Sequence, residues 1–405
     1  MKKQMDNLNQ ATKQDSVFSP SRAVWRTQME KGIYTPHRVS RITCIVNQLL
    51  ADTIVDFLNK IEVMVYDETG RIIRQHVRTR PYGMAGEIMK LESTAVRIFR
   101  FTVPRKNSEL VVNAIINIAG LYIPGRGTIF SQELMEFSKE PPEFNISALS
   151  DVEFETSNFT LLNKLSYVIC VLSDPGSGDQ MAKIALDLGI CVPVITFGTG
   201  NDIRDQLGLI RITIPPEKEI VHLIMPEQDS ETVIKLLVEQ ARLDKPGKGF
   251  IYQTPVSIGL IDTRMKIGKQ KNAATMEQII AAIDQLKNGT SWRKRLDDDA
   301  ESSKIAKSMM PQDNCEISIV SDEDRIDLLR ETCLEIGAAG ATTSKVLPRT
   351  NKEDVVSAMI RSAISVPAQI TDMVVDKLLE VSTIKESTTD RIQVLDSPAA
   401  YVRSL

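Results

Sequence analysis

The chain has 405 residues, of which 42% are hydrophobic and 25% are charged, and its formal net charge at pH 7 is −4. This length predicts two or three domains at roughly 100–200 residues each, and the composition excludes a disordered or fibrous protein. The small negative charge argues against a nucleic-acid partner, because nucleic acids attract proteins that carry clustered positive charge.

Residues 1–40 are polar and predict a tail that precedes the folded part of the chain. Residues 41–137 predict a first module, with elements in the order strand, helix, strand, strand, helix, strand. The predicted strands are 42–47, 63–66, 96–103 and 128–137. The two predicted helices carry apolar stripes at Leu50, Ile54, Phe57 and Ile61, and at Val112, Ile115, Ile116 and Ala119.

Residues 138–165 are rich in Glu, Pro and Asn and predict a linker, and residues 166–268 repeat the same order of elements as a second module. Its predicted strands are 167–173, 192–199, 219–225 and 249–256. Its predicted helices carry apolar stripes at Met181, Ile184, Ala185 and Leu188, and at Val233, Leu236, Leu237 and Ala241.

Residues 269–312 predict a second linker with a short helix at 276–286, and residues 313–405 predict a third module. Its predicted strands are 316–320, 342–347, 357–366 and 391–395. Its predicted helices carry apolar stripes at Ile326, Leu329, Cys333 and Ile336, and at Val374, Leu378 and Val381. Because three segments of similar length keep one order of elements, the sequence indicates a threefold internal repeat.

Each repeat predicts an α+β, ferredoxin-like βαββαβ module, in which both helices cover one face of a four-stranded antiparallel sheet. The other face also needs a cover, because the segment 220–225 is apolar at nearly every position instead of alternating with polar residues. We therefore expect the three modules to bury these faces against one another as an intramolecular pseudo-trimer. The alternative is three separate modules that hide the same faces in homo-oligomers.

The segment 165–260 resembles the PII and PII-like signalling family, most clearly in PPEKEIV at 215–221 and in KPGKGFIY at 245–252, which resembles the family's B-loop. The segment from Gly198 to Gly200, followed by 207–209, is similar to the shortened T-loop of PII-like members. In the first module, IPGRGTIF at 123–130 resembles the same B-loop, whereas IKESTTD at 384–390 replaces it in the degenerate third module.

This resemblance implies trimers of βαββαβ units that bind adenine nucleotides between subunits and move loops to grip a transporter, an enzyme or a regulator. ATP, ADP, AMP or cyclic AMP is then the expected ligand, and no tightly bound cofactor is expected. Two features depart from the family. Phe250 and Thr128 replace its phosphate-binding lysine, and Lys248 and Arg126 stand between the loop glycines where nucleotide-binding members often carry Asp.

Glycine loops suit an anion, because a residue without Cβ lets backbone N–H groups converge on it. The alternative is that these glycines serve ordinary turns between a helix and a strand. A second loop, 174–179, lacks the pattern of a phosphate loop and predicts a plain turn with Ser177 or Asp179 as helix cap. The candidate anion-binding residues are Gly125, Arg126 and Gly127 in the first module, and Lys245, Gly247, Lys248, Gly249, Gly198 and Gly200 in the second.

Neither a catalytic site nor a metal site is predicted. His37, His76 and His222 lie in different predicted elements without an acidic companion at metal or acid/base spacing, and the five cysteines contain no CxxC pair. The polar N-terminus and the absence of a run of about 18 apolar residues predict a cytoplasmic chain that does not span a membrane.

The predicted function is therefore that of a PII-like regulatory protein and not of an enzyme. It would sense an adenine nucleotide or a small anionic metabolite between modules and regulate a partner protein in nitrogen or inorganic-carbon metabolism. One alternative is a degenerate PII-like scaffold that binds no nucleotide. Another is a metal-tolerance protein of the CutA type, which shares the topology but needs a cluster of metal ligands.

Overall fold

A computed structural model of the chain describes residues 36–79, 87–142, 144–149, 158–201, 217–243, 245, 247–262, 314–338, 340–349, 357–382 and 390–401. The chain divides into two compact units, Met1–Pro36 and His37–Leu405, and the description below concerns the second. The predicted helix at 276–286 and the predicted loop segments 207–209 and 384–389 lie outside the described residues.

Module 1 has the predicted order of elements. It consists of β1 (His37–Asn47), α3 (Ala51–Lys60), β2 (Val65–Thr79), β3 (Glu87–Pro104), α4 (Ser108–Ala119) and β4 (Gly127–Phe137). Its strands are hydrogen-bonded in the order β4-β1-β3-β2, which is that of a ferredoxin-like sheet. Strand β1 begins at His37, inside the segment predicted as a tail, because residues 39–46 are buried between β3 and β4.

Modules 2 and 3 repeat this topology, with strand orders β8-β5-β7-β6 and β12-β9-β11-β10. Module 2 consists of β5 (Leu162–Leu172), α5 (Ser177–Asp187), β6 (Val194–Asn201), β7 (Glu217–Pro226), α7 (Glu227–Gln240) and β8 (Gly249–Leu260). Module 3 consists of β9 (Asn314–Ser321), α10 (Glu323–Ile336), β10 (Gly340–Arg349), β11 (Met359–Pro367), α11 (Thr371–Val381), β12 (Arg391–Ser397) and β13 (Ala399–Tyr401). The sequence did not predict β13.

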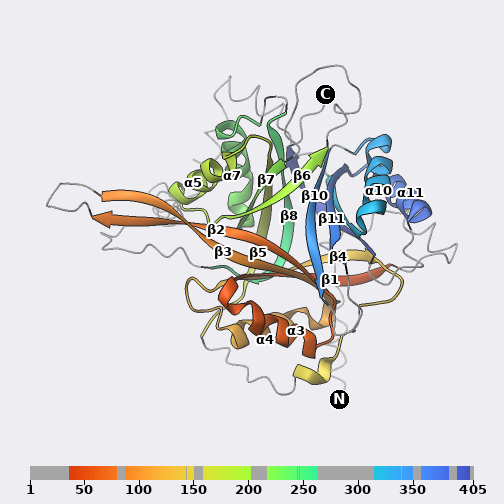
Figure 1. The fold of residues 1–405 in the computed structure, drawn as a ribbon, viewed down its shortest axis with the longest axis horizontal. Coiled ribbons are helices and arrows are strands. Elements are labelled where there is room, and N and C mark those ends of the chain that lie inside the picture. Colours follow the sequence, from red (N-terminus) through yellow and green to blue (C-terminus); the bar gives the residue numbers. More distant parts are fainter. Residues whose placement is uncertain are drawn as a thin grey trace, which may run out of the picture. The chain divides into compact units, whose positions relative to one another are not determined.

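The two helices of each module lie together on one side of its sheet, and each pair faces outward (Figure 1). The predicted helical stripes lie on the buried side. In α3, for example, Ile54 and Phe57 pack with the strand residues Ile42 and Cys44 in one hydrophobic cluster. In α5, Met181 and Ala185 pack against Cys170 of β5. These clusters form the helix-side cores of modules 1 and 2.

The three sheets join by strand pairing, so that neighbouring modules share backbone hydrogen bonds. Each pair of modules has two such pairings among the described residues. They are β2–β6 and β4–β8 between modules 1 and 2, β2–β10 and β4–β12 between modules 1 and 3, and β6–β10 and β8–β13 between modules 2 and 3. This connectivity is consistent with the predicted intramolecular pseudo-trimer.

The sheet faces that the helices leave bare are covered by the neighbouring modules, as predicted. Ile45, Ile98 and Phe130 of module 1 form one buried cluster with Ile169 and Ile220 of module 2. Successive side chains of β7 therefore point to two faces that are both buried. Val221 points to the helix-side core and Ile220 to this inner cluster. A continuous apolar strand is the sequence signature of burial on both faces.

Ion pairs add to the strand pairing at the boundary between modules 1 and 3. The fully buried Asp67 of β2 accepts hydrogen bonds from Arg97 of β3 and from Arg349 Nε of β10, the latter at 2.8 Å. Its carboxylate thus bridges two modules.

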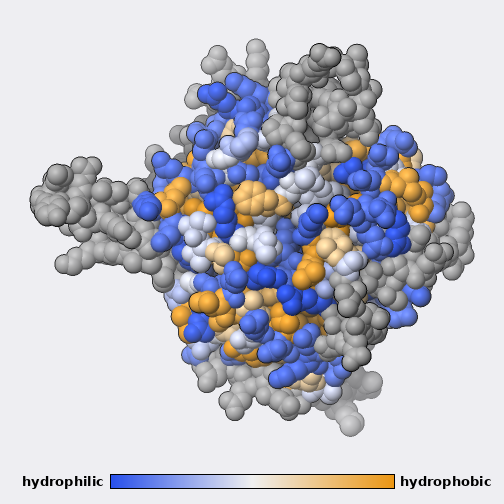
Figure 2. All heavy atoms as spheres, in the orientation of Figure 1, coloured by the Kyte–Doolittle hydropathy of each residue, from blue (hydrophilic) through white to orange (hydrophobic). Residues whose placement is uncertain are grey.

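No helix among the described residues is long and apolar enough to cross a membrane. On the face drawn in Figure 2, hydrophobic residues lie interspersed with hydrophilic ones.

We predict that the three modules unfold as one unit and that Asp67→Ala destabilises all of them. The change should lower the free energy of unfolding by roughly 3 kcal/mol, because it leaves two arginines without their buried carboxylate. Urea unfolding followed by circular dichroism measures this. Glu231→Ala is the control, since its exposed pair with Lys235 contributes less than about 1 kcal/mol. Separate transitions for the modules would contradict the prediction.

Candidate functional site

The two glycine loops occupy matching positions in modules 1 and 2. Gly127 pairs with Val46 at the end of β1, and Gly249 pairs with Leu172 at the end of β5. The loop carbonyls match as well, since Arg126 O accepts from Asn47 N–H and Lys248 O accepts from Ser173 N–H, both at 3.1 Å. The repetition that the sequence indicated is therefore a repetition of backbone geometry.

The second glycine of each loop is required by close packing of two strands. A Cβ on Gly127 would lie 2.2 Å from the carbonyl oxygen of Ile45, and one on Gly249 would lie 1.9 Å from that of Val171. Gly249 also has φ +131°, which L side chains rarely adopt. A turn with a structural role thus accounts for these two glycines without a ligand.

In module 1 the loop holds a carboxylate of the chain itself. Gly125 N–H donates to Asp262 Oδ1 at 2.8 Å, and Arg74 Nη2 donates to Asp262 Oδ2 at 2.6 Å. Arg126, predicted to bind a ligand, instead donates to the carbonyl of Ala119 at the end of α4, at 2.9 Å. The backbone of this loop and Arg74 thus hold the carboxylate of Asp262, and the predicted binding of an external anion by Gly125, Arg126 and Gly127 stays a prediction.

In module 2 the matching loop carries two lysines. Lys248 Nζ lies 2.5 Å from Asp174 Oδ2, and both side chains are well exposed, at 36% and 52%. Lys245 is exposed as well, and Gly247 takes the position that matches Gly125. The loop lies at the boundary with module 3, because Ile251 of β8 pairs with Tyr401 of β13.

The loop 174–179 is a helix-starting turn, as predicted, but its cap differs from the prediction. The amide of Gly178 donates to Glu219 Oε2 of β7 at 2.5 Å. Ser177 donates to the carbonyl of Asp174, and Asp179 accepts from Arg71 of β2, so neither residue caps α5. A carboxylate from another strand occupies the N-terminus of this helix, where its negative charge is favoured.

Gly198 and Gly200 lie inside β6, in its pairing with β10 of module 3. Gly200 is opposite Thr342, and a Cβ on Gly198 would lie 2.5 Å from the carbonyl oxygen of Thr343. The hydroxyls of Thr199 and Thr343 are 2.6 Å apart. These glycines permit close contact between modules 2 and 3.

The loop predicted to be degenerate in module 3 is described only at its end. There the buried Asp390 lies 3.2 Å from Arg325 of α10. This acidic side chain therefore pairs within its own module.

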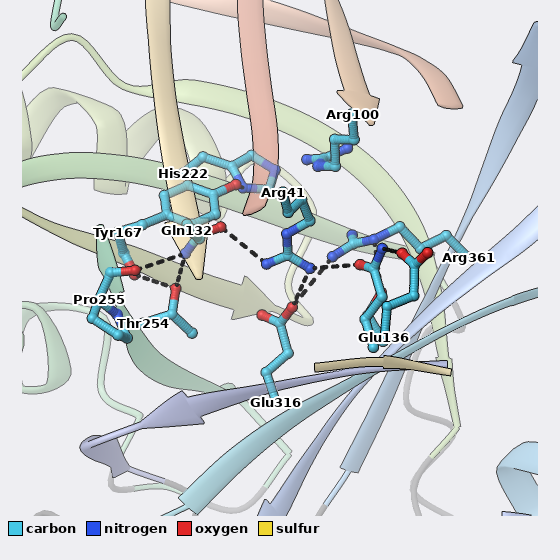
Figure 3. Close-up of polar contacts among 12 residues, drawn as sticks. Arg41, Arg100, Gln132, Glu136, Tyr167, His222, Thr254, Pro255, Glu316 and Arg361 are labelled. Atoms are coloured by element: carbon cyan, nitrogen blue, oxygen red, sulfur yellow. Dashed lines mark hydrogen bonds and ion pairs between the residues drawn. The ribbon is translucent and has the colours of Figure 1, made fainter. Parts of the chain in front are cut away.

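A buried polar network lies where the inner faces of the sheets meet (Figure 3). Arg41 of β1 donates to Glu316 of β9 at 2.9 Å and to Gln132 of β4 at 3.0 Å. Gln132 in turn donates to Thr254 of β8 at 2.8 Å, so three modules contribute to one chain of hydrogen bonds. Arg361 of β11 adds a second cation 3.6 Å from Glu316. Buried charges need such partners, because isolation from water is costly.

The charge of Glu316 is set by its neighbours. Burial alone raises the pKa of this carboxyl, but Arg41 and Arg361 outweigh burial and hold its pKa below the ordinary value. Glu316 therefore stays ionised in the interior.

His222 occupies in module 2 the position that Arg100 occupies in module 1, since His222 pairs with Ile169 and Arg100 with Thr43. Its ring nitrogens lie 2.7 Å from Tyr167 Oη and 2.8 Å from Thr196 Oγ1. Burial, together with Arg100 and Arg361, lowers the pKa of His222 well below its ordinary value. His222 is thus a neutral, satisfied interior residue.

The motifs of the sequence do not indicate this network. One signal existed, namely polar residues at alternate positions of strands that are otherwise apolar, such as Arg41 in β1 and Glu316 in β9. Among the described residues, no group of three His, Cys, Asp or Glu side chains is placed to hold a metal ion.

No protein-family model and no curated protein matches the sequence. Among solved structures, an aspartate kinase from Synechocystis aligns with 89% of this chain and 44% of the kinase chain, at 10% sequence identity and a TM-score of 0.20. The chain thus spans less than half the length of that kinase chain. A match at this level does not place the chain in a family, and the resemblance to PII stays a prediction.

We predict that the loop glycine and the loop lysine have separable roles. Gly249→Ala should destabilise the protein by at least about 2 kcal/mol, because the added Cβ collides with the backbone of β5. Lys248→Ala should change stability by less than about 1 kcal/mol, since its ion pair is exposed. Thermal melting of both variants tests this, and equal stability of Gly249→Ala and the natural protein would contradict it.

We also predict that His222 makes the folded protein less stable as the pH falls. The unfolded histidine takes up a proton as the pH falls below 6.5, whereas the folded one does not, so stability should fall by up to about 1.4 kcal/mol per pH unit. His222→Gln removes this proton uptake and should flatten the dependence between pH 6.5 and 5. The half-buried His37, changed to Gln, is the control and should flatten it less. Identical slopes for natural protein and His222→Gln would refute the assignment.

Proposed function

We propose that the chain is a PII-like regulatory protein that binds a small anion, foremost an adenine nucleotide, at the glycine loop of module 2. In this proposal it acts in the cytoplasm and relays occupancy to a partner protein in nitrogen or inorganic-carbon metabolism. The observation that carries the proposal is the matching loop of module 1, whose Gly125 N–H and neighbouring Arg74 bind a carboxylate. A loop with this backbone geometry is therefore able to bind an oxyanion.

The loop of module 2 offers the same backbone with more positive charge. Lys245 and Lys248 flank Gly247, and both lysines reach solvent. The pair of Lys248 with Asp174 is exposed, so it contributes little to stability and can be exchanged for a phosphate. Phe250, next to Gly249, offers a half-buried aromatic face stacked on Tyr252 at 6.0 Å, beside Gly340 of module 3. An aromatic face beside a cationic loop suits a nucleotide, which has a flat base and a charged tail.

A binding role is supported over catalysis by the state of the cysteines and of His222. All five cysteines are buried, and burial raises the pKa of the Cys44 and Cys170 thiols and that of Cys333 to about 12. A thiol in this environment is a poor nucleophile. His222, with both ring nitrogens in hydrogen bonds, has no free nitrogen to act as a base.

The ribbon formed by β2 and β3 is the element we propose for contact with a partner. The two strands pair continuously from Val65 with Phe101 to Thr79 with Glu87. Beyond Ile72, which pairs with Val194 of β6, the only described strand partner of β2 is β3. The outer part of this ribbon therefore has backbone edges that another protein can use.

The alternative, a scaffold that binds no nucleotide, is favoured by two observations. Gly127 and Gly249 are both explained by close strand packing, and the lysine that the family uses for phosphate is replaced by Thr128 and Phe250. Under this alternative the loops are turns and the partner contacts carry the function.

Calorimetric titration with ATP, ADP, AMP, cyclic AMP and bicarbonate separates the two functions. We predict one molecule of the best ligand per chain at the module 2 loop. Lys248→Ala should weaken binding by roughly 1–3 kcal/mol, the range for a hydrogen bond to a charged group. Asp174→Asn should strengthen binding, because it releases Lys248 from its competing carboxylate.

Lys183→Ala is a matched control, since it removes an exposed lysine of the same module from α5 instead of from the loop. It should leave the affinity unchanged. If none of the five compounds binds, or if Lys183→Ala weakens binding as much as Lys248→Ala, the sensor function fails and the scaffold function is favoured.

A further inference from the structure

Asp262 is a buried carboxylate whose surroundings are those of a bound anion. It follows the end of β8, and its side chain is only 1% exposed. Gly125 N–H and Arg74 Nη2 donate to its two oxygens at 2.8 and 2.6 Å. Its own backbone N–H donates to Thr128 Oγ1 at 2.9 Å, which fixes the carboxylate in the loop. A backbone amide and a guanidinium are donors that also bind phosphate or carboxylate ligands.

We propose that the glycine loop of module 1 is an oxyanion site that the chain closes with its own Asp262, and that an external carboxylate or phosphoryl group competes for it. This inference rests on the proposed function only in taking the ligand to be an anion. It assigns different states to the two matching loops: the loop of module 2 is open, and the loop of module 1 is closed.

The loop that leads into the site lies at the surface. The loop residues Tyr122, Ile123 and Pro124, which precede Gly125, are exposed. Arg74 also has a spare donor, because its Nη1 is buried without a hydrogen-bond partner among the described residues. A ligand with three oxygens could use this nitrogen, whereas the two oxygens of Asp262 leave it unpaired.

Exchange of Asp262 for an external anion would release the end of β8 from β2. Three side chains near the base of the β2–β3 ribbon are held by acidic residues of module 2. The contacts are Arg71 with Asp179 at 2.6 Å, Arg74 with Asp262 at 2.6 Å, and Gln75 with Asp187 at 2.5 Å. Asp262 is the one of the three acids that is buried in the loop. Ligand binding at this site would thus keep Arg74 paired but uncouple module 2 from the ribbon at this point.

Chemical rescue of Asp262→Ala in the full chain tests the proposal. The change removes the carboxylate and leaves Arg74 and Gly125 without their acceptor, so the melting temperature should fall. Sodium formate should restore it by roughly 3–5 °C above the effect of sodium chloride at equal ionic strength, because an anion that binds only the folded state stabilises it. Sodium phosphate is the second probe. Rescue by formate alone assigns a carboxylate ligand, and rescue by phosphate assigns a phosphoryl ligand.

Two further variants make the result specific. Asp187→Ala removes an acidic contact of the same ribbon outside the loop and should show no rescue. Arg74→Gln combined with Asp262→Ala should not be rescued, since the cationic donor is gone. If Asp262→Ala does not fold in buffer, refolding in formate or phosphate should recover the circular dichroism spectrum of the natural protein.

Equal effects of formate and phosphate on all variants, or no recovery of Asp262→Ala in either anion, would overturn the proposal. The double variant Asp262→Ala with Lys248→Ala distinguishes rescue at the loop of module 1 from anion binding at the loop of module 2. Rescue that persists in this double variant supports the closed loop of module 1 even if no nucleotide binds to module 2. If a nucleotide binds the natural protein but no anion rescues Asp262→Ala, the sensor function is supported and the proposal of a closed loop in module 1 is rejected.

Discussion

The structure depends on one constraint: a βαββαβ sheet has helices on only one face, and its second face must be buried. Modules 1 and 2 meet this constraint with apolar residues, as in the cluster of Ile98, Phe130 and Ile220. Toward module 3 the same interior is polar, with Arg41 bonded to Glu316. Apolar contacts permit several packings, whereas a buried ion pair permits few, because each charge must keep its partner. The polar side of the interior thus adds charge pairing to the strand pairing that joins the third module to the other two.

Three modules in one chain can diverge at positions that a homotrimer would keep identical. Arg100 and His222 occupy matching positions in β3 and β7, and one is a cation while the other is a neutral ring. The glycine loops differ in the same way. The loop of module 1 binds Asp262, and the matching loop of module 2 presents Lys248 toward solvent. Covalent linkage therefore converts one repeated backbone into sites with different chemistry.

Periodicity predicted the elements of all three modules because strands and helices with buried faces carry that burial in their local sequence. The stripe in α4, for instance, is buried at each predicted position from Val112 to Ala119. Contacts between segments that are distant along the chain have no local sequence pattern from which they could be predicted. Asp262 lies 137 positions from Gly125 along the chain, and nothing near either residue indicates the other. Likewise, Gly198 resembled a loop residue until its approach to Thr343 of another module was known. Short β13 lacks the length that a periodic signal needs.

The central claim is that an anion binds the loop of module 2 at its boundary with module 3. Amide hydrogen exchange of the full chain, measured with and without ATP, tests this most directly. The account predicts slower exchange at residues 245–252 and in β13, which pairs with β8 there. Exchange at loop 125–127 should change less than exchange at 245–252, because an external anion must first displace Asp262 there. Unchanged exchange at 245–252 under ATP concentrations that alter exchange elsewhere in the chain would contradict the account.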